Sequence, residues 1–287
     1  MLIIFKNEIN GLNIEMNIEK FEQIQKNRIF LLLNYVITFL CIYFLFIKIR
    51  EYEINLNFDI GNSTLVVLLI CLSSIFQAIA WSKLVTGNYD SHEIYSWFNS
   101  IIGKYFPFKI GIISKRLFNK KKNLKSMIIL KNIIKEQIIV ISVLSFFSLY
   151  LIVNPQFLFF IFLLLVVILK NKAESKLFSS VLYCFIAESV FILGLVVFIN
   201  NYIDGNLIQI VLIYMFSSVL STFVTTAPAG FGIREYLFIV ICDYLNFESN
   251  ENLLLIILSF RLLIICSDLI IFLNSFFYKA SLKNKDL

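Results

Sequence analysis

Residues 64–82 read TLVVLLICLSSIFQAIAWS and carry no charged side chain. An α-helix needs about 20 predominantly apolar residues to cross the hydrocarbon core of a bilayer, so this stretch predicts a membrane-spanning helix. Comparable apolar runs lie on both sides of it. Together they predict an all-α, polytopic membrane bundle of about eight spans. The spans are expected near residues 29–47, 64–82, 133–153, 156–169, 177–199, 207–226, 234–246 and 252–277.

The composition supports a membrane protein. Of the 287 residues, 59% are hydrophobic and only 15% are charged. Soluble domains have about 25% charged residues, and a soluble core of this length has no room for so much apolar surface. The net charge of +6 does not indicate a nucleic-acid-binding protein, because the charges lie between apolar runs and form no soluble basic domain.

Lys and Arg are distributed unevenly among the segments that connect the expected spans. They are frequent in residues 1–28, 83–135, 170–176 and 279–287, and absent from residues 154–155, 200–206 and 247–251. Because cytoplasmic loops carry the excess of Lys and Arg, an even number of spans with both termini in the cytoplasm explains this alternation. Only residues 48–59 depart from it, and their two cations are offset by acidic residues.

We therefore expect a multi-pass protein of the inner (plasma) membrane with a simple domain organisation. Residues 1–28 form a cytoplasmic N-terminal segment, residues 29–278 a single transmembrane domain, and residues 279–287 a cytoplasmic tail. The five cysteines lie in apolar runs without a C-x-x-C pair, and His92 is the single histidine. No phosphate-binding G-x-x-x-x-G-K-[ST] run is present. We expect neither a metal site nor a cofactor.

Two segments interrupt the helical pattern, at residues 103–111 (GKYFPFKIG) and 225–235 (TTAPAGFGIRE). Proline removes a backbone donor and glycine widens the accessible dihedral angles, so each segment should break a helix. Irregular backbone at membrane depth is tolerated only where it is buried in protein or lines a cavity. Paired breaks in the two halves predict re-entrant segments, an inverted repeat and a central binding site. Two ordinary cytoplasmic turns are the alternative.

The second interrupted segment has the composition of an anion site. Gly230 and Gly232 allow backbone N–H groups to approach a ligand, and Arg234 follows at the expected start of a helix. A helix N-terminus, a glycine-rich turn and an arginine together favour binding of a phosphate or carboxylate. Glu235 would orient Arg234 or exchange a proton. Alternatively, Arg234 and Glu235 form a purely structural bridge.

Several ionisable residues lie inside the expected spans, where an uncompensated charge is costly. Glu188 is in the middle of the fifth span, and Arg261 and Asp268 share one face of the eighth because they are seven residues apart. One interpretation is a buried polar network in which Arg261 is neutralised by Asp268, Asp243 or Glu188. The other is an anionic-headgroup cavity lined by Arg261 and Arg234, with Glu188 as charge or proton partner.

The order of these features resembles the transmembrane region of lysylphosphatidylglycerol synthases and the wider flippase-like family that contains it. Residues 228–235, PAGFGIRE, look like the family's P-[AG]-G-x-G-x-R-E run. Residues 103–109 are similar to its G-K-Y-x-P-G-K run, Arg261 to the arginine of its last span, and Trp81 to the aromatic residue that ends its second span. The resemblance covers residues 29–278.

The chain departs from the family pattern at two places. Phe108 stands where the family often has glycine, so the first interrupted segment is expected to be less tightly turned. No soluble aminoacyltransferase domain follows the last span before Leu287. The resemblance therefore implies the lipid-translocating half without the synthase half, and it does not name the lipid.

The resulting expectation is a flippase-like protein, not an enzyme, that moves a phospholipid or a polyprenyl-phosphate-linked (glyco)lipid between leaflets during assembly of the cell envelope. Asp243 and Asp268 join Glu188 as expected charge partners. The expected substrate-binding residues are Lys104, Pro107, Lys109, Pro228, Gly230, Gly232, Arg234, Glu235 and Arg261.

Two other functions are compatible with the sequence. One is a scaffold that partners an envelope glycosyltransferase without transporting anything. The other is an integral-membrane lipid transferase, for which Asp90 and Glu93 beside His92 are the candidate acidic residues.

Overall fold

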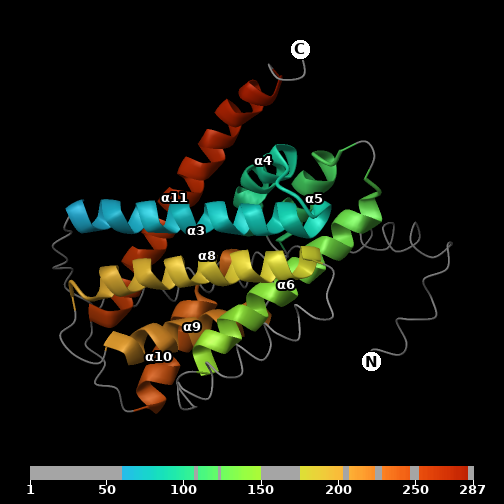
Figure 1. Cartoon of the computed structure of the whole chain (residues 1–287). Coiled ribbons are helices and arrows are strands. Elements are labelled where there is room, and N and C mark those ends of the chain that lie inside the picture. The colour runs from blue at the N-terminus through green and yellow to red at the C-terminus, as the bar shows by residue number, and fades with distance from the viewer. Residues whose placement is uncertain are drawn as a thin grey trace, which may run out of the picture.

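The structure is a computed structural model, and it describes residues 60–106, 109–121, 124–149, 175–202, 207–223, 228–245 and 252–283. Within these ranges the regular structure is entirely helical, in agreement with the predicted all-α class (Figure 1). The spans expected at residues 29–47 and 156–169 lie outside the described residues.

Three of the described helices are long and apolar enough to cross a membrane, as predicted. They are α3 (Ile60–Thr86), α8 (Ser175–Ile199) and α11 (Asn252–Lys283). A fourth helix, α9 (Leu207–Phe223), is apolar but shorter. These helices give the protein its membrane-helical character, whereas the total of about eight spans stays a prediction.

Two further helices coincide only partly with expected spans. The helix α6 (Ser126–Leu149) carries Lys131, Lys135 and Glu136 in its first half. The helix α10 (Ile233–Tyr244) has 12 residues. At about 1.5 Å per residue it extends about 18 Å. It is therefore too short to cross a hydrocarbon core of about 30 Å by itself.

The long helices α3 and α8 pack against each other along most of their length (Figure 1). The largest core cluster fills the space where α8, α9, α10 and α11 meet, around the buried rings of Phe198, Tyr214, Phe238 and Phe260. The rings of Phe198 and Phe260 lie 5.5 Å apart. Close packing of these aromatic rings holds the helices around the cavity described below.

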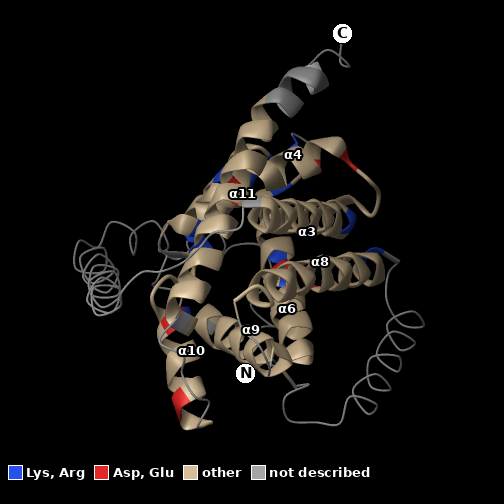
Figure 2. Ribbon diagram, turned by 90° about the vertical axis from the view of Figure 1, so that its left-hand side faces the viewer, with Lys and Arg blue, Asp and Glu red and all other residues tan. Residues whose placement is uncertain are grey.

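Apolar side chains also cover outward faces of the long helices. On α3 and α11 the exposed apolar residues recur at intervals of three, four or seven, so each set forms a stripe along one helix face. The stripes comprise Leu65, Leu68, Leu72 and Ile75 on α3, and Leu262, Leu269, Leu273 and Phe276 on α11. Stripes of this kind are suited to contact with lipid chains. Figure 2 shows long neutral stretches along these helices and few charged positions.

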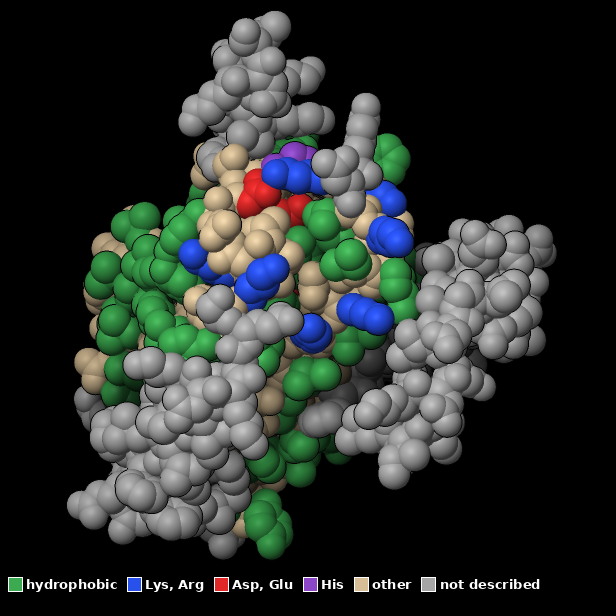
Figure 3. Space-filling model, turned by 45° about the vertical axis from the view of Figure 1, so that its right-hand side comes forward, with side chains coloured by type: hydrophobic (Ala, Val, Ile, Leu, Met, Phe, Trp, Pro, Cys, Tyr) green, Lys and Arg blue, Asp and Glu red, His purple; other side chains and the backbone are tan. Residues whose placement is uncertain are grey.

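Short elements form an insert between α3 and α6. They are α4 (Ser91–Ser100), the 3-10 helix η2 (Ile101–Tyr105) and α5 (Ile110–Phe118). The space-filling view shows Lys and Arg side chains gathered on the face formed by this insert and the start of α6 (Figure 3). Exposed lysines between α5 and α6 and in the first half of α6 are Lys121, Lys125, Lys131 and Lys135. This is the segment whose charge predicts a cytoplasmic location.

Candidate functional site: a cavity between the two interrupted segments

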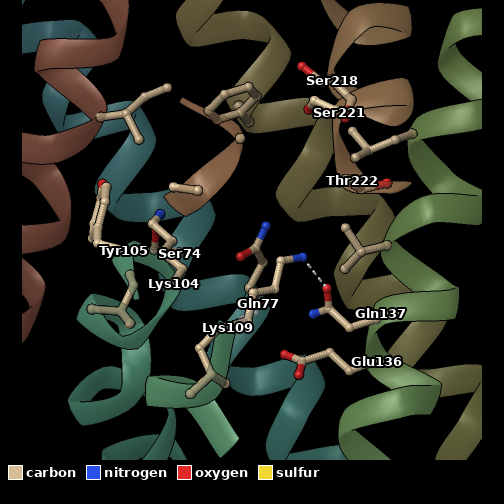
Figure 4. A pocket seen from close by; sticks show the side chains of 18 of the residues that line it. Ser74, Gln77, Lys104, Tyr105, Lys109, Glu136, Gln137, Ser218, Ser221 and Thr222 are labelled. Carbon is tan, nitrogen blue, oxygen red and sulfur yellow. Dashed lines mark hydrogen bonds between the residues drawn. The ribbon is translucent and has the colours of Figure 1, made fainter. Parts of the chain in front are cut away.

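A cavity of about 250 Å³ lies among the helices, and both interrupted segments contribute to its wall (Figure 4). The 3-10 helix η2 of the first segment contacts the 3-10 helix η4 (Pro228–Gly230) of the second. The two breaks are thus parts of one site and not separate turns. The charged lining residues are Lys104, Lys109, Arg116, Glu136, Glu188, Arg234 and Arg261.

The first break is shaped by a close approach of two glycines. A Cβ atom added to Gly103 would lie 2.3 Å from the carbonyl carbon of Gly111, so neither position has room for a side chain. The left-handed backbone conformation falls on Lys109, with φ of 53°. Glycine is therefore needed for packing and not, as expected, for its dihedral freedom. Pro107 and Phe108 lie outside the described residues.

The second break combines a turn with the start of α10. Ala229, Gly230 and Gly232 all have positive φ, at 51°, 72° and 83°. The helix begins at Ile233, as predicted, and Gly232 donates its N–H to Oε2 of Glu235 at 2.7 Å. In this structure Glu235 therefore occupies the amide of Gly232, which was expected to approach a ligand. Gly230 lines the cavity, and Pro228 starts η4.

Arg261 forms its ion pair with Glu235, a residue far from it in the sequence. Its Nε lies 3.1 Å from Oε1 of Glu235, and its Nη2 donates to the carbonyl oxygen of Ala229 at 2.9 Å. Arg261 is 5% exposed and Glu235 is fully buried. The partners expected for Arg261 were Asp268, Asp243 or Glu188, and the structure shows Glu235 instead. Glu235 therefore pairs with Arg261 and does not orient Arg234.

Asp268, which lies on α11 like Arg261, contacts the first break. Its Oδ2 forms an ion pair with Nζ of Lys104, at 2.6 Å, and accepts a hydrogen bond from the hydroxyl of Tyr105. Asp268 and Arg261 share one face of α11, as their spacing predicts. One holds η2 while the other holds η4 and the start of α10, so α11 ties the two breaks together.

Asp243 does not line the cavity in this structure. It is exposed near the end of α10. Among the described residues it forms no ion pair. The expectation that Asp243 is a charge partner of the site is therefore not met in this structure.

Arg116, Glu136 and Gln137 line the cavity but were not among the expected site residues. Arg116 forms a buried ion pair with Glu136, which also accepts from Nε1 of Trp97 at 2.9 Å. The guanidinium of Arg116 lies 4.0 Å from the ring centroid of Trp81. This cluster closes one end of the cavity. In the sequence, Arg116 is indistinguishable from the lysines around it.

Two cations of the cavity have only neutral partners. Nζ of Lys109 donates to Oε1 of Gln137 at 2.7 Å (Figure 4). Arg234 donates to the hydroxyl of Tyr214 at 3.2 Å and to that of Ser221 at 3.5 Å. In the part of the chain that the structure describes, neither cation has a carboxylate within 4.0 Å. Burial and the nearby charge of Arg234 lower the pKa of Lys109, which lies outside the spanning helices.

Glu188 is the remaining carboxylate on the cavity wall. It is 4% exposed, and its Oε1 accepts from Nε2 of Gln77 at 3.0 Å. No cation of the described residues lies within ion-pair distance of it. Glu188 belongs to α8, whereas Lys109 and Arg234, which share the cavity wall with it, come from other elements.

The acidic residues around His92 have structural partners. Asp90 accepts from the backbone N–H of His92, at the start of α4, and pairs with Lys121 at 2.5 Å. Glu93 is 1% exposed and accepts from Nε1 of Trp81 at 3.2 Å. Both carboxylates thus hold α4 against its neighbours.

No protein-family model, no curated protein and no solved structure matches this chain. The resemblance to the transmembrane region of lysylphosphatidylglycerol synthases therefore stays a prediction.

Proposed function

We propose that the protein is a flippase-like membrane protein that binds the phosphate of a phospholipid or a polyprenyl-phosphate-linked (glyco)lipid in this cavity and moves the lipid between leaflets. The observation that carries the proposal is the pair of cavity cations, Lys109 and Arg234, that have no carboxylate partner among the described residues. We place it in the inner membrane with both termini in the cytoplasm, as the distribution of Lys and Arg favours.

The charge balance of the cavity supports an anionic ligand. Three ion pairs cancel within the protein: Lys104 with Asp268, Arg116 with Glu136, and Arg261 with Glu235. Among the described lining residues, the charges left without an ionic partner are the two cations Lys109 and Arg234 and the single carboxylate of Glu188. Both cations are partly buried, and a charge withdrawn from water without an ionic partner is costly. A phosphate bound between the two cations would remove that cost.

The shape of the site is compatible with a lipid. The polar cavity would take the headgroup, while the apolar stripes on the outward faces of α3 and α11 suit acyl or prenyl chains. Arginine binds phosphate oxygens through two parallel N–H groups, and lysine adds a point charge. The low dielectric of a buried site strengthens both contacts relative to water.

We further propose that the two breaks are related elements of an inverted repeat. Among their described residues, each contains one non-glycine residue in the left-handed conformation, Lys109 in the first and Ala229 in the second. Each lines the cavity, and each is held by α11. Strained backbone of this kind is kept where the surrounding structure enforces it, and it concentrates at functional sites.

A lipid-flux assay in proteoliposomes tests the proposal. Arg234→Gln and Lys109→Gln should each reduce the rate of inter-leaflet movement of an anionic fluorescent phospholipid by at least about tenfold, because a charged hydrogen bond contributes about 1.5–3 kcal/mol. The matched control is Lys135→Gln, an exposed lysine on α6 next to the cavity residue Glu136. It should leave flux unchanged.

Normal flux in both cavity variants would refute the proposed path. If the wild-type protein itself moved no lipid, a scaffold for an envelope glycosyltransferase would become the better explanation.

A further inference from the structure

The hydroxyl groups on one wall of the cavity donate their hydrogen bonds to backbone carbonyl oxygens of their own helix. Ser218, Ser221 and Thr222 lie along α9 (Figure 4) and donate to the carbonyl oxygens of Tyr214, Ser218 and Val219, at 2.7, 2.8 and 2.6 Å. A hydroxyl that donates to its own helix retains only its acceptor lone pairs for other partners. Toward the cavity this wall can therefore accept hydrogen bonds but not donate them.

A second group of acceptors lies on α3 and α8. Gln77 uses its amide nitrogen to donate to Glu188, so its carbonyl oxygen is left as an acceptor. Glu188, as a carboxylate, has acceptor capacity beyond the single hydrogen bond that Gln77 supplies. Both residues line the cavity.

The donors of the cavity come from other elements. Lys109, from the start of α5, reaches toward Gln137 of α6 (Figure 4). Because Gln137 accepts from Lys109 through Oε1, its amide nitrogen is left as a donor. Arg234 adds guanidinium N–H groups from α10. The cavity is thus divided into a cationic, donating part and a largely neutral, accepting part.

This division deepens the proposed function and rests on it. We infer that the ligand is a phosphodiester whose outer substituent carries hydroxyl groups, as in a glycerol, inositol or sugar headgroup. The phosphate binds Lys109 and Arg234, and the hydroxyl protons are accepted by Thr222, Ser218 and Gln77.

Other headgroups complement the wall less well. A choline substituent has no N–H or O–H to donate, and a bare phosphate leaves the accepting wall without a partner. An ammonium substituent would pair with Glu188, the lining carboxylate of the described residues without a cationic partner, but a zwitterionic headgroup has no net charge and would leave the net positive charge of Lys109, Arg234 and Glu188 uncompensated. Hydroxyl groups match neutral acceptors, and they can also accept from the amide nitrogen of Gln137.

Native mass spectrometry of the purified full-length protein tests this inference. Delipidated protein is exposed to an equimolar mixture of phosphatidylglycerol, phosphatidylethanolamine, phosphatidylcholine and phosphatidic acid with identical acyl chains. We expect phosphatidylglycerol to be retained over each of the others by about fivefold or more, because one net hydrogen bond contributes about 1 kcal/mol.

Variants of Thr222 test whether its hydroxyl oxygen contributes to the headgroup preference. Thr222→Val keeps the shape of the side chain but removes the acceptor, so the ratio of phosphatidylglycerol to phosphatidylcholine should fall about fivefold. Thr222→Ser should restore that ratio. The ratio is measured within one sample, so a lower yield of folded protein does not change it.

The outcomes separate this inference from the proposed function. Equal retention of phosphatidylglycerol and phosphatidylcholine, both lost in Arg234→Gln, would overturn the hydroxyl headgroup and leave the phosphate site standing. Preference for phosphatidylethanolamine would overturn it in favour of an ammonium headgroup. Retention of no phospholipid by the wild-type protein would overturn the proposed function as well.

Discussion

Lys109 and Arg234 differ from the other cations of the cavity in the groups that they contact. Lys104, Arg116 and Arg261 each have a carboxylate partner, whereas Lys109 and Arg234 contact an amide and hydroxyls. A buried ion pair broken on one side costs about 3–5 kcal/mol. The paired cations are therefore held within the protein, and the two others are available to a ligand.

The titration of Lys109 should appear in lipid binding. Burial and the charge of Arg234 lower its pKa from the ordinary value of 10.5. Lys109 is charged below its pKa and neutral above it, so its attraction for an anionic phosphodiester depends on pH. It should fall as pH rises through this lowered pKa, by up to about tenfold per pH unit. Equilibrium binding of a short-chain phosphatidylglycerol between pH 7 and pH 10.5 measures this.

Lys109→Arg is the control for that titration, since a guanidinium stays charged over the whole range. Its affinity should not follow the same curve. If the pH dependence persisted unchanged in Lys109→Arg, another group would be responsible for it.

The pair of Arg261 and Glu235 should be important for stability. Glu235→Gln leaves Arg261 buried without an anionic partner, which costs about 3–5 kcal/mol of unfolding free energy. Asp243→Asn is the matched control, because it makes the same chemical change at an exposed position on the same helix. It should stay within about 0.5 kcal/mol of the wild type. Denaturant unfolding in detergent micelles measures both, and equal stability of the two variants would contradict the assignment.

Most charged residues of the cavity were predictable, with Arg116 and Glu136 as exceptions, but which of them pair was not. The spacing of Arg261 and Asp268 predicts a shared helix face, and the structure has it. Their partners, Glu235 and Lys104, come from two breaks that are far apart in the sequence and meet only in the folded protein. Helical periodicity carries no information about such contacts.

The two breaks are built in different ways, although proline and glycine mark both in the sequence. In the second, glycines adopt positive φ; in the first, Gly103 and Gly111 allow two backbones to touch. Composition reveals where a helix ends, but it does not reveal whether a glycine is there for its dihedral angles or for its small size.

Gly103→Ala should disrupt the first break. The added Cβ would lie 2.3 Å from the carbonyl carbon of Gly111, and backbone atoms cannot move aside as a flexible side chain can. We expect a loss of at least about 1–3 kcal/mol in stability, as for other overpacked sites. Thermal unfolding in detergent measures it.

Gly194→Ala is the control for a glycine that is not needed. Its Cβ would lie 3.4 Å from Cβ of Leu69, an ordinary contact, in the interior of α8. Alanine is favoured over glycine in a helix by about 1 kcal/mol, so this variant should be neutral or slightly stabilised. A Gly103→Ala protein as stable as Gly194→Ala would show that the tight approach is absent.

The long apolar helices were the most predictable part of the molecule. Residues 64–82, 177–199 and 252–277 all fall inside helices that are apolar enough to cross a membrane. The expected span at 234–246 corresponds to a helix too short to cross alone, because the break at 228–232 takes up the residues before it. A hydropathy window that counts only apolar residues does not detect that a helix is interrupted near its start.

Embedding of α11 in the bilayer should protect Cys266. This side chain is exposed on the protein surface within the apolar part of α11. If α11 spans the membrane, lipid covers the thiol and suppresses the thiolate that reacts with maleimide. In intact membranes, a variant with Cys266 as its sole cysteine should react with a charged maleimide at least about tenfold more slowly than a thiol in water.

A variant with Lys121→Cys as its sole cysteine provides the comparison, since the Lys121 side chain is 44% exposed and lies in the charged segment after α5. It should be labelled readily. Rapid labelling of Cys266 in intact membranes would contradict the proposed span.

The most direct test of the central claim is a cryo-EM structure of the protein in nanodiscs that contain phosphatidylglycerol. The account predicts phosphate density in the cavity within hydrogen-bond distance of Nζ of Lys109 and the guanidinium of Arg234, with the glycerol toward α9 and Gln77. Lipid phosphates bound only at the exposed lysines of α6 and of the segment between α5 and α6, with no lipid in the cavity, would contradict it.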